Sequence, residues 1–170
     1  MNAKLAVRRK AISETKIELR GKLWPDIKES DLWSRKRGPG FTTIPRTLPL
    51  FMEIMDSMSN AAPVSKVYLD LWCRSFDENV VSLNNKDEMA FYCGFGGQRG
   101  VQTWTKRIKI LESLGFIRTA TGANGQISYA LILNPYNVVQ THRGKKTPGL
   151  TDRHYNALVI RANEIKADDI

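Results

Sequence analysis

Residues 98–109 combine side chains that form paired hydrogen bonds with side chains that carry positive charge. The set consists of Gln98, Arg99, Gln102, Thr103, Lys106, Arg107 and Lys109. An arginine guanidinium can donate two hydrogen bonds to guanine O6 and N7, a glutamine amide can pair with adenine N6 and N7, and a lysine ammonium can neutralise a phosphate. These residue types therefore suit contacts to the base edges and the backbone of a nucleic acid.

A helix must carry these side chains if they are to act together on one surface. Apolar residues spaced three and four apart predict such a helix from about 98 to 114. The apolar residues on its core side are Val101, Trp104, Ile108 and Leu111. Arg107 and Lys109 lie furthest along the helix, where a phosphate is their expected target. The alternative is that the polar side is only the solvated face of an amphipathic helix.

A short helix and a tight turn are expected in front of this helix. Asn85, with Glu88 three residues later, has the spacing of a capping box and predicts a helix start. Residues 94–97, with the sequence Gly-Phe-Gly-Gly, end this short helix and permit a sharp turn. Two further helices are predicted upstream, one after Pro49 and one after Pro63.

A β-hairpin is expected behind the longer helix. Residues 116–120 and 127–133 read as strands, and Asn124-Gly125 between them is the strongest short hairpin signal. From 64 to 133 the order is helix, strand, short helix, turn, long helix, strand, hairpin turn and strand. This is the order of a winged helix-turn-helix, in which the long helix enters a major groove and the hairpin is the wing. We therefore expect an α+β, mostly helical fold that contains a winged helix-turn-helix.

The stretch from Thr103 to Ile117, TWTKRIKILESLGFI, resembles the recognition helix of bacterial winged-helix proteins. The resemblance covers residues 64–133 and is similar in style to proteins of plasmids, phages and integrative elements, including replication-initiator modules. It implies that the hairpin lies beside the phosphate backbone. The residues expected to contact DNA from the hairpin are Arg118, Thr121 and Asn124. Residues 121–126 contain no Lys or Arg, so a hairpin without a DNA contact remains the alternative.

Basic residues are concentrated at the N-terminal end of a chain of 170 residues with a net charge of +9. Residues 1–47 hold 12 Lys or Arg against five Asp or Glu, whereas residues 48–134 hold eight of each and residues 135–170 hold six against four. Such an excess favours an acidic polymer as partner. The distribution predicts a basic arm over 1–47, a winged helix-turn-helix domain over 48–134, and a basic loop and helix over 135–170.

Two further basic clusters are candidate contacts outside the long helix. Arg35, Lys36 and Arg37 precede Gly-Pro-Gly in a run expected to be extended, which predicts either an arm for a minor groove or a charged linker. A basic loop is expected near residue 145, with a phosphate contact as its functional interpretation. Its basic residues are Arg143, Lys145 and Lys146.

Catalytic, cofactor and metal motifs are not found in the sequence. The glycines of residues 94–100 match neither a dinucleotide-binding nor a P-loop motif. His142 and His154 stand alone, and no C-x-x-C is present. Cys73 and Cys93 are expected as reduced core residues, and the tryptophans, Trp72 and Trp104 above all, as core and docking residues. We expect no enzyme activity, no metal, no cofactor and no small-molecule ligand.

The expected function is sequence-specific binding of double-stranded DNA, as a transcriptional regulator or as a replication or maintenance factor of a bacterial mobile element. The alternative is a winged-helix protein-interaction module in a nucleoprotein complex, with nonspecific nucleic-acid contacts. The last helix, after Thr151, is expected either to form a homodimer or to pack on its own core. No signal peptide or apolar run of membrane-spanning length is visible, which predicts a cytoplasmic, nucleoid-associated protein with no membrane partner.

Overall fold

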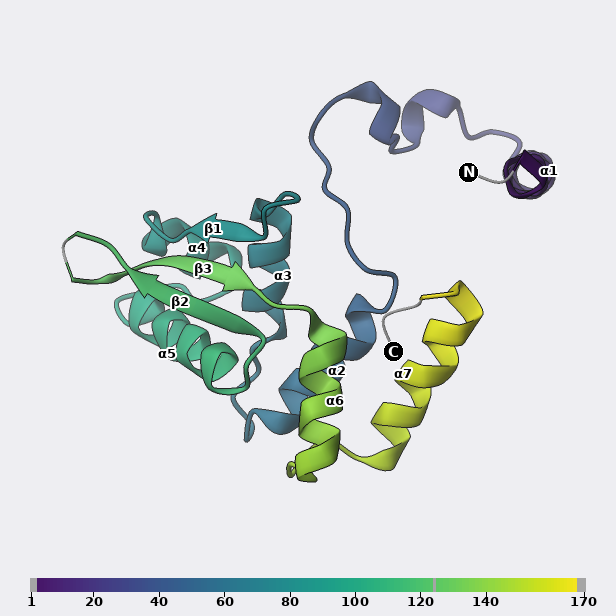
Figure 1. Cartoon of the computed structure of the whole chain (residues 1–170). Coiled ribbons are helices and arrows are strands. Elements are labelled where there is room, and N and C mark those ends of the chain that lie inside the picture. Colours follow the sequence, from purple (N-terminus) through teal and green to yellow (C-terminus); the bar gives the residue numbers. More distant parts are fainter. Residues whose placement is uncertain (1–2, 124, 168–170) are drawn as a thin grey trace. The chain divides into compact units, whose positions relative to one another are not determined.

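The computed structural model describes residues 3–123 and 125–167, and it divides into two compact units, Met1–Gly40 and Phe41–Ile170 (Figure 1). The first unit contains α1 (Ala3–Leu23) and two single turns of 3-10 helix, η1 (Glu29–Asp31) and η2 (Arg35–Arg37). None of the side chains described between residues 11 and 40 is buried. This unit therefore has no hydrophobic core in its described part.

The expectation that residues 35–37 are extended is wrong. They form the turn η2, because the hydroxyl of Ser34 accepts a hydrogen bond from the backbone N–H of Lys36, 3.3 Å away. A serine at this position satisfies a backbone donor that would otherwise need water.

The second unit is α+β and mostly helical. Its elements, in chain order, are α2 (Leu48–Met58), α3 (Ser65–Arg74), β1 (Val80–Ser82), α4 (Lys86–Tyr92), α5 (Gly100–Ser113), β2 (Ile117–Thr121), β3 (Ile127–Ile132), α6 (Pro135–Lys145) and α7 (Asp152–Ile165). The strands form an antiparallel sheet in the order β1-β3-β2. The expected α+β, mostly helical fold class is therefore confirmed, and the arrangement is compatible with a winged helix.

One hydrophobic core joins the helices of the second unit to its sheet. Phe51 of α2 packs edge-on against Tyr136 of α6, with ring centroids 4.8 Å apart. Leu158 and Ala162 of α7 are fully buried in the same core. The two C-terminal helices therefore belong to the same compact unit as α2 to β3. That unit begins at Phe41, seven residues before the expected domain start.

A carboxylate from α2 fixes the start of α3. Asp56 accepts hydrogen bonds from the backbone N–H of Val64 (2.6 Å) and of Ser65 (2.8 Å), and a third from the Ser65 hydroxyl (2.5 Å). These are donors that a helix N-terminus leaves without partners. Asp56 therefore joins α2 to α3 across the break at Pro63.

Three local expectations fail. Asn85 stands at the N-cap of α4 but makes no side-chain capping bond, and Glu88 lies 3.4 Å from Arg74 instead. Cys73 is exposed rather than in the core, whereas Cys93 is buried. The expected basic loop is the last turn of α6, and Lys146 is its left-handed C-cap. Cations at a helix C-terminus are favoured by the helix dipole, which explains why the helix continues through them.

Candidate nucleic-acid interface

The helix α5 has one buried side and one polar side. Its buried residues are Gly100, Trp104, Ile108 and Leu111. Gln102, Lys106 and Lys109 are exposed, and Thr103 is half-buried beside them. The three/four spacing thus separates core contacts from solvent contacts along the helix. This places three of the expected contact residues on an accessible surface.

The helix begins at Gly100, two residues later than expected, so Gln98 and Arg99 lie in the turn before it. Both side chains are exposed. Arg99 is the N-cap residue, and its carbonyl accepts a hydrogen bond from Thr103. Gln98 and Arg99 are therefore presented at the N-terminal end of α5 rather than along its side.

A close backbone contact sets the geometry of the α4–α5 turn. Gly97 has a φ of +79°, which L side chains rarely adopt. A Cβ on Gly100 would lie 2.3 Å from the carbonyl oxygen of Phe95, so only glycine fits there. Phe95 in turn packs against the core. The turn therefore holds α5 at a defined angle to α4.

Arg107 is held against the α4–α5 turn. Its guanidinium lies 5.9 Å from the centre of the Phe95 ring, and its Nε is buried without a hydrogen-bond partner. The side chain is half-buried. Arg107, which is expected to contact a phosphate, thus also stabilises the turn through its cation–π interaction with Phe95. The sequence signal for this role was the aromatic residue between glycines.

A single carboxylate anchors the β2–β3 hairpin to α5. Glu112, half-buried near the end of α5, accepts hydrogen bonds from the backbone N–H and the hydroxyl of Thr119 in β2. At the other end of the hairpin, the Lys86 ammonium donates to the side chain of Gln126 at 3.3 Å. Lys86 therefore brings a cation to a turn that has none of its own, and the sequence pattern gave no sign of it.

Neighbouring side chains of β2 lie on opposite faces of the sheet. Thr119 points toward α5, and strand alternation puts its neighbour Arg118 on the opposite side of the sheet. Arg118 pairs there with Leu131, and both side chains are exposed. Thr121 is exposed at the end of β2, and Asn124 lies outside the described residues. Arg118 is thus separated by the sheet from Thr119 and α5.

The other two basic clusters belong to elements other than α5. Arg35 and Lys36 are exposed in the first unit, and the side chain of Arg37 lies outside what the structure describes. Arg143 pairs with Asp152 and lies 5.2 Å from the centre of the Tyr155 ring, whereas Lys145 and Lys146 are exposed. The α6 cluster is linked to α5 through His142, whose Nε2 lies 2.7 Å from the carbonyl oxygen of Leu114.

Charge is unevenly distributed along the second unit. Residues 99–118 contain five Lys or Arg and one acidic residue, Glu112, which is bonded to Thr119. Residues 53–88 contain seven Asp or Glu and three Lys or Arg. The segment from the α4–α5 turn to β2 is therefore the positive part of a nearly balanced region. Such a segment attracts phosphates more strongly than its surroundings do.

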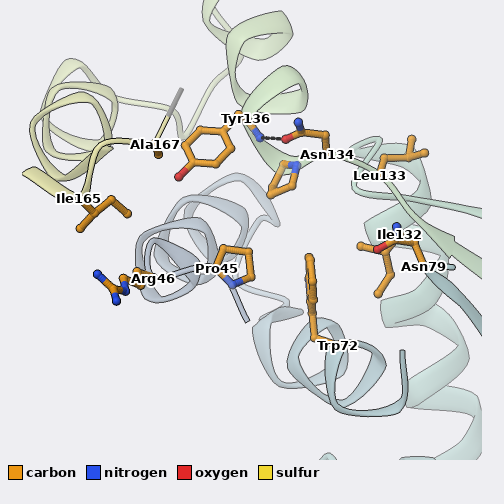
Figure 2. Close-up of a pocket in the computed structure, with 11 residues that line it drawn as sticks. Pro45, Arg46, Trp72, Asn79, Ile132, Leu133, Asn134, Tyr136, Ile165 and Ala167 are labelled. Carbon is orange, nitrogen blue, oxygen red and sulfur yellow. Dashed lines mark hydrogen bonds between the residues drawn. The ribbon is translucent and has the colours of Figure 1, made fainter. Parts of the chain in front are cut away.

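A cavity of about 450 Å³ lies between α3, the end of β3 and the C-terminal helices (Figure 2). Trp72 and Arg46 are among the residues that line it. The other lining residues are Pro45, Asn79, Ile132, Leu133, Asn134, Pro135, Tyr136, Ile165 and Ala167. The Tyr136 hydroxyl is already bonded to Thr47 at 2.7 Å. The lining thus offers one cation, from Arg46, but no acid–base pair for catalysis.

Within residues 3–123 and 125–167, no group of three or more His, Cys, Asp or Glu is arranged to hold a metal ion. No helix in the same residues is long and apolar enough to cross a membrane. Comparison with protein-family models, curated proteins and solved structures found no match for this chain.

Proposed function

We propose that this chain is a winged helix-turn-helix protein that binds double-stranded DNA sequence-specifically, with α5 in the major groove. The observation that carries the proposal is the polar side of α5. Gln102, Lys106 and Lys109 are exposed opposite a buried stripe that includes Trp104. A glutamine suits an adenine edge, and the lysines that follow it on the same side of the helix suit phosphates. Arg99, at the N-terminal end of the helix, suits guanine.

The fixed geometry of the surrounding elements supports the same function. A helix reads bases only if its scaffold holds it rigidly against the duplex. Gly100 sets the angle of α5 through its contact with Phe95, and Glu112 fixes the hairpin to α5 through Thr119. The role we assign is a transcriptional regulator or a replication or maintenance factor of a bacterial mobile element. A homodimer through α7 stays a prediction.

A protein-interaction module is the second candidate, and an exposed aromatic pair favours it. Phe91 and Tyr92 of α4 are 70% and 62% exposed, with ring centroids 6.2 Å apart. Aromatic side chains of this kind are enriched at protein interfaces. In that case the nucleic-acid contacts would be independent of sequence.

Selection from a random duplex library tests the proposal. The full chain should enrich a defined motif, and by fluorescence anisotropy it should bind that duplex about 10³-fold or more tightly than a scrambled one at physiological salt. A library that stays random after repeated selection, with equal affinity for both duplexes, would contradict sequence-specific binding and favour the interaction module.

A further inference from the structure

Trp33 is the most exposed large apolar side chain of the described residues, at 76%. It belongs to the first unit and lies between η1 and η2. A tryptophan carries a large apolar surface, which is usually buried against a partner. Within the first unit, its ring is therefore available to a partner.

A hollow of about 240 Å³ lies beside this indole. Its lining consists of Leu32, Trp33, Ser34, Gly38 and Gly40. No atom lies within 4 Å of the position that a Cβ would take on either glycine, so this wall of the hollow is open. The volume is below the range of about 300–1,000 Å³ of pockets that enclose drug-sized ligands. It suits one planar ring system lying against the indole.

Positive charge follows directly along the chain. Arg35 and Lys36 are exposed on η2, and residues 32–52 contain no Asp or Glu. An aromatic platform next to cations is the combination that binds phosphate-linked bases, because the ring stacks on the base while the cations neutralise the backbone. A duplex does not offer this contact, because each base within it is stacked between two neighbouring bases that cover both of its faces.

We propose that the hollow beside Trp33 binds an unpaired base of a single-stranded nucleic acid, with Arg35 and Lys36 next to the flanking phosphates. This site is separate from the polar side of α5, which takes duplex DNA, and it does not depend on that function. Single-stranded DNA and RNA share the chemistry it recognises. The alternative, a contact to duplex phosphates alone, is an outcome of the test below.

The experiment measures binding of the full chain to fluorescein-labelled dT10 and rU10, and to a duplex of unrelated sequence, by anisotropy at low salt. Base–aromatic stacking predicts that Trp33→Ala weakens single-strand binding roughly 5- to 150-fold. Trp33→Phe should retain most of the affinity. Trp24→Ala is the matched control, because Trp24 is also exposed in the first unit but does not line the hollow; it should change the affinity less than twofold.

A loss of affinity that is confined to Trp33→Ala and to single strands supports the site. Whichever of dT10 and rU10 binds more tightly then identifies the ligand as single-stranded DNA or RNA. Equal affinity of Trp33→Ala and wild type would overturn the proposal, as would an equal loss in Trp24→Ala or on the duplex. Gln140→Ala serves as a second control, because Gln140 is exposed on α6 and belongs to neither proposed contact surface, so dT10 binding should be unchanged. A loss of fold is not expected in Trp33→Ala, since this side chain has no buried contacts to lose.

Discussion

The Glu112 carboxylate accepts two hydrogen bonds from Thr119, one from its backbone N–H at 2.8 Å and one from its hydroxyl at 2.6 Å. Thr119 is half-buried between the hairpin and α5. One side chain thus fixes the hairpin relative to the helix that we propose to read DNA. Because both donors depend on it, its removal should affect the two elements together.

Glu112→Ala should lower the free energy of unfolding by about 1–3 kcal/mol, since it leaves two partly buried donors without an acceptor. Urea denaturation followed by circular dichroism measures this loss. Glu53→Ala is the control, because Glu53 is exposed on α2, and it should change stability by less than about 0.5 kcal/mol. Equal stability of both variants would show that the Thr119 contact does not hold the hairpin.

Gly100→Ala should destabilise the α4–α5 turn by about 1–3 kcal/mol, because its Cβ would meet the Phe95 carbonyl oxygen at 2.3 Å. Its thermal midpoint and its affinity for the selected duplex should both fall. Gly96→Ala is the matched control in the same turn, since a Cβ there meets no atom within 4 Å. If Gly100→Ala melts at the wild-type temperature, the turn is not the rigid support described above.

The two cysteines should differ in reactivity toward a thiol reagent at pH 8. Cys73 is exposed, whereas burial raises the pKa of Cys93 from 9.0 to about 11 and keeps its thiol protonated. We expect one fast-reacting thiol in the native chain and two in urea. Cys73→Ser should remove the fast phase, and a fast phase that persists in that variant would contradict the burial of Cys93.

The same pKa shift predicts a loss of stability in alkali. Because the folded pKa of Cys93 exceeds the unfolded one, the folded state favours the neutral thiol, and this contribution is complete below pH 9 and lost as the pH rises toward 11. Cys93→Ala should therefore show a smaller drop in unfolding free energy between pH 8.5 and 10.5 than wild type, by denaturant titration at each pH. An identical drop would assign the alkaline loss to other groups.

Deletion of residues 1–40 should leave the second unit folded, because its buried residues begin at Thr47. The thermal midpoint should change by less than about 4 °C, roughly the shift that 1 kcal/mol causes in a domain of about 100–150 residues. The salt dependence of dT10 binding should become flatter, since log K changes by about 0.7 per log salt for each phosphate contacted on a single strand. A truncated chain that unfolds would show that the first unit contributes to the core.

Local periodicity was sufficient to predict the order of elements from α2 to β3. The stripe that includes Trp104 and Leu111 identified both the helix α5 and its exposed side, where Gln102 and Lys106 lie. The Asn124-Gly125 signal gave the hairpin between β2 and β3. These features follow from contacts between near neighbours in the chain, which a sequence pattern records directly.

Tertiary contacts account for what the sequence did not reveal. Glu112 to Thr119, Lys86 to Gln126 and His142 to Leu114 each join different elements, so no local spacing marks them. The exposure of Cys73 has the same cause, because an apolar helical pattern does not show which side chains at the margin of the apolar face the other elements cover. The division at Gly40 was also missed, because the seven residues after it carry no helical pattern.

Readout of bases by α5 is the central claim, and two alanine variants test it most directly. On the selected duplex, Gln102→Ala and Arg99→Ala should each lose about 1–3 kcal/mol of binding free energy, because each removes hydrogen bonds to a base edge. Gln140→Ala and Arg153→Ala are the matched controls, exposed on α6 and α7, and they should bind like wild type. On a scrambled duplex all four variants should differ little from wild type. If Gln102→Ala and Arg99→Ala weaken binding equally on the selected and the scrambled duplex, α5 does not read bases and the claim is wrong.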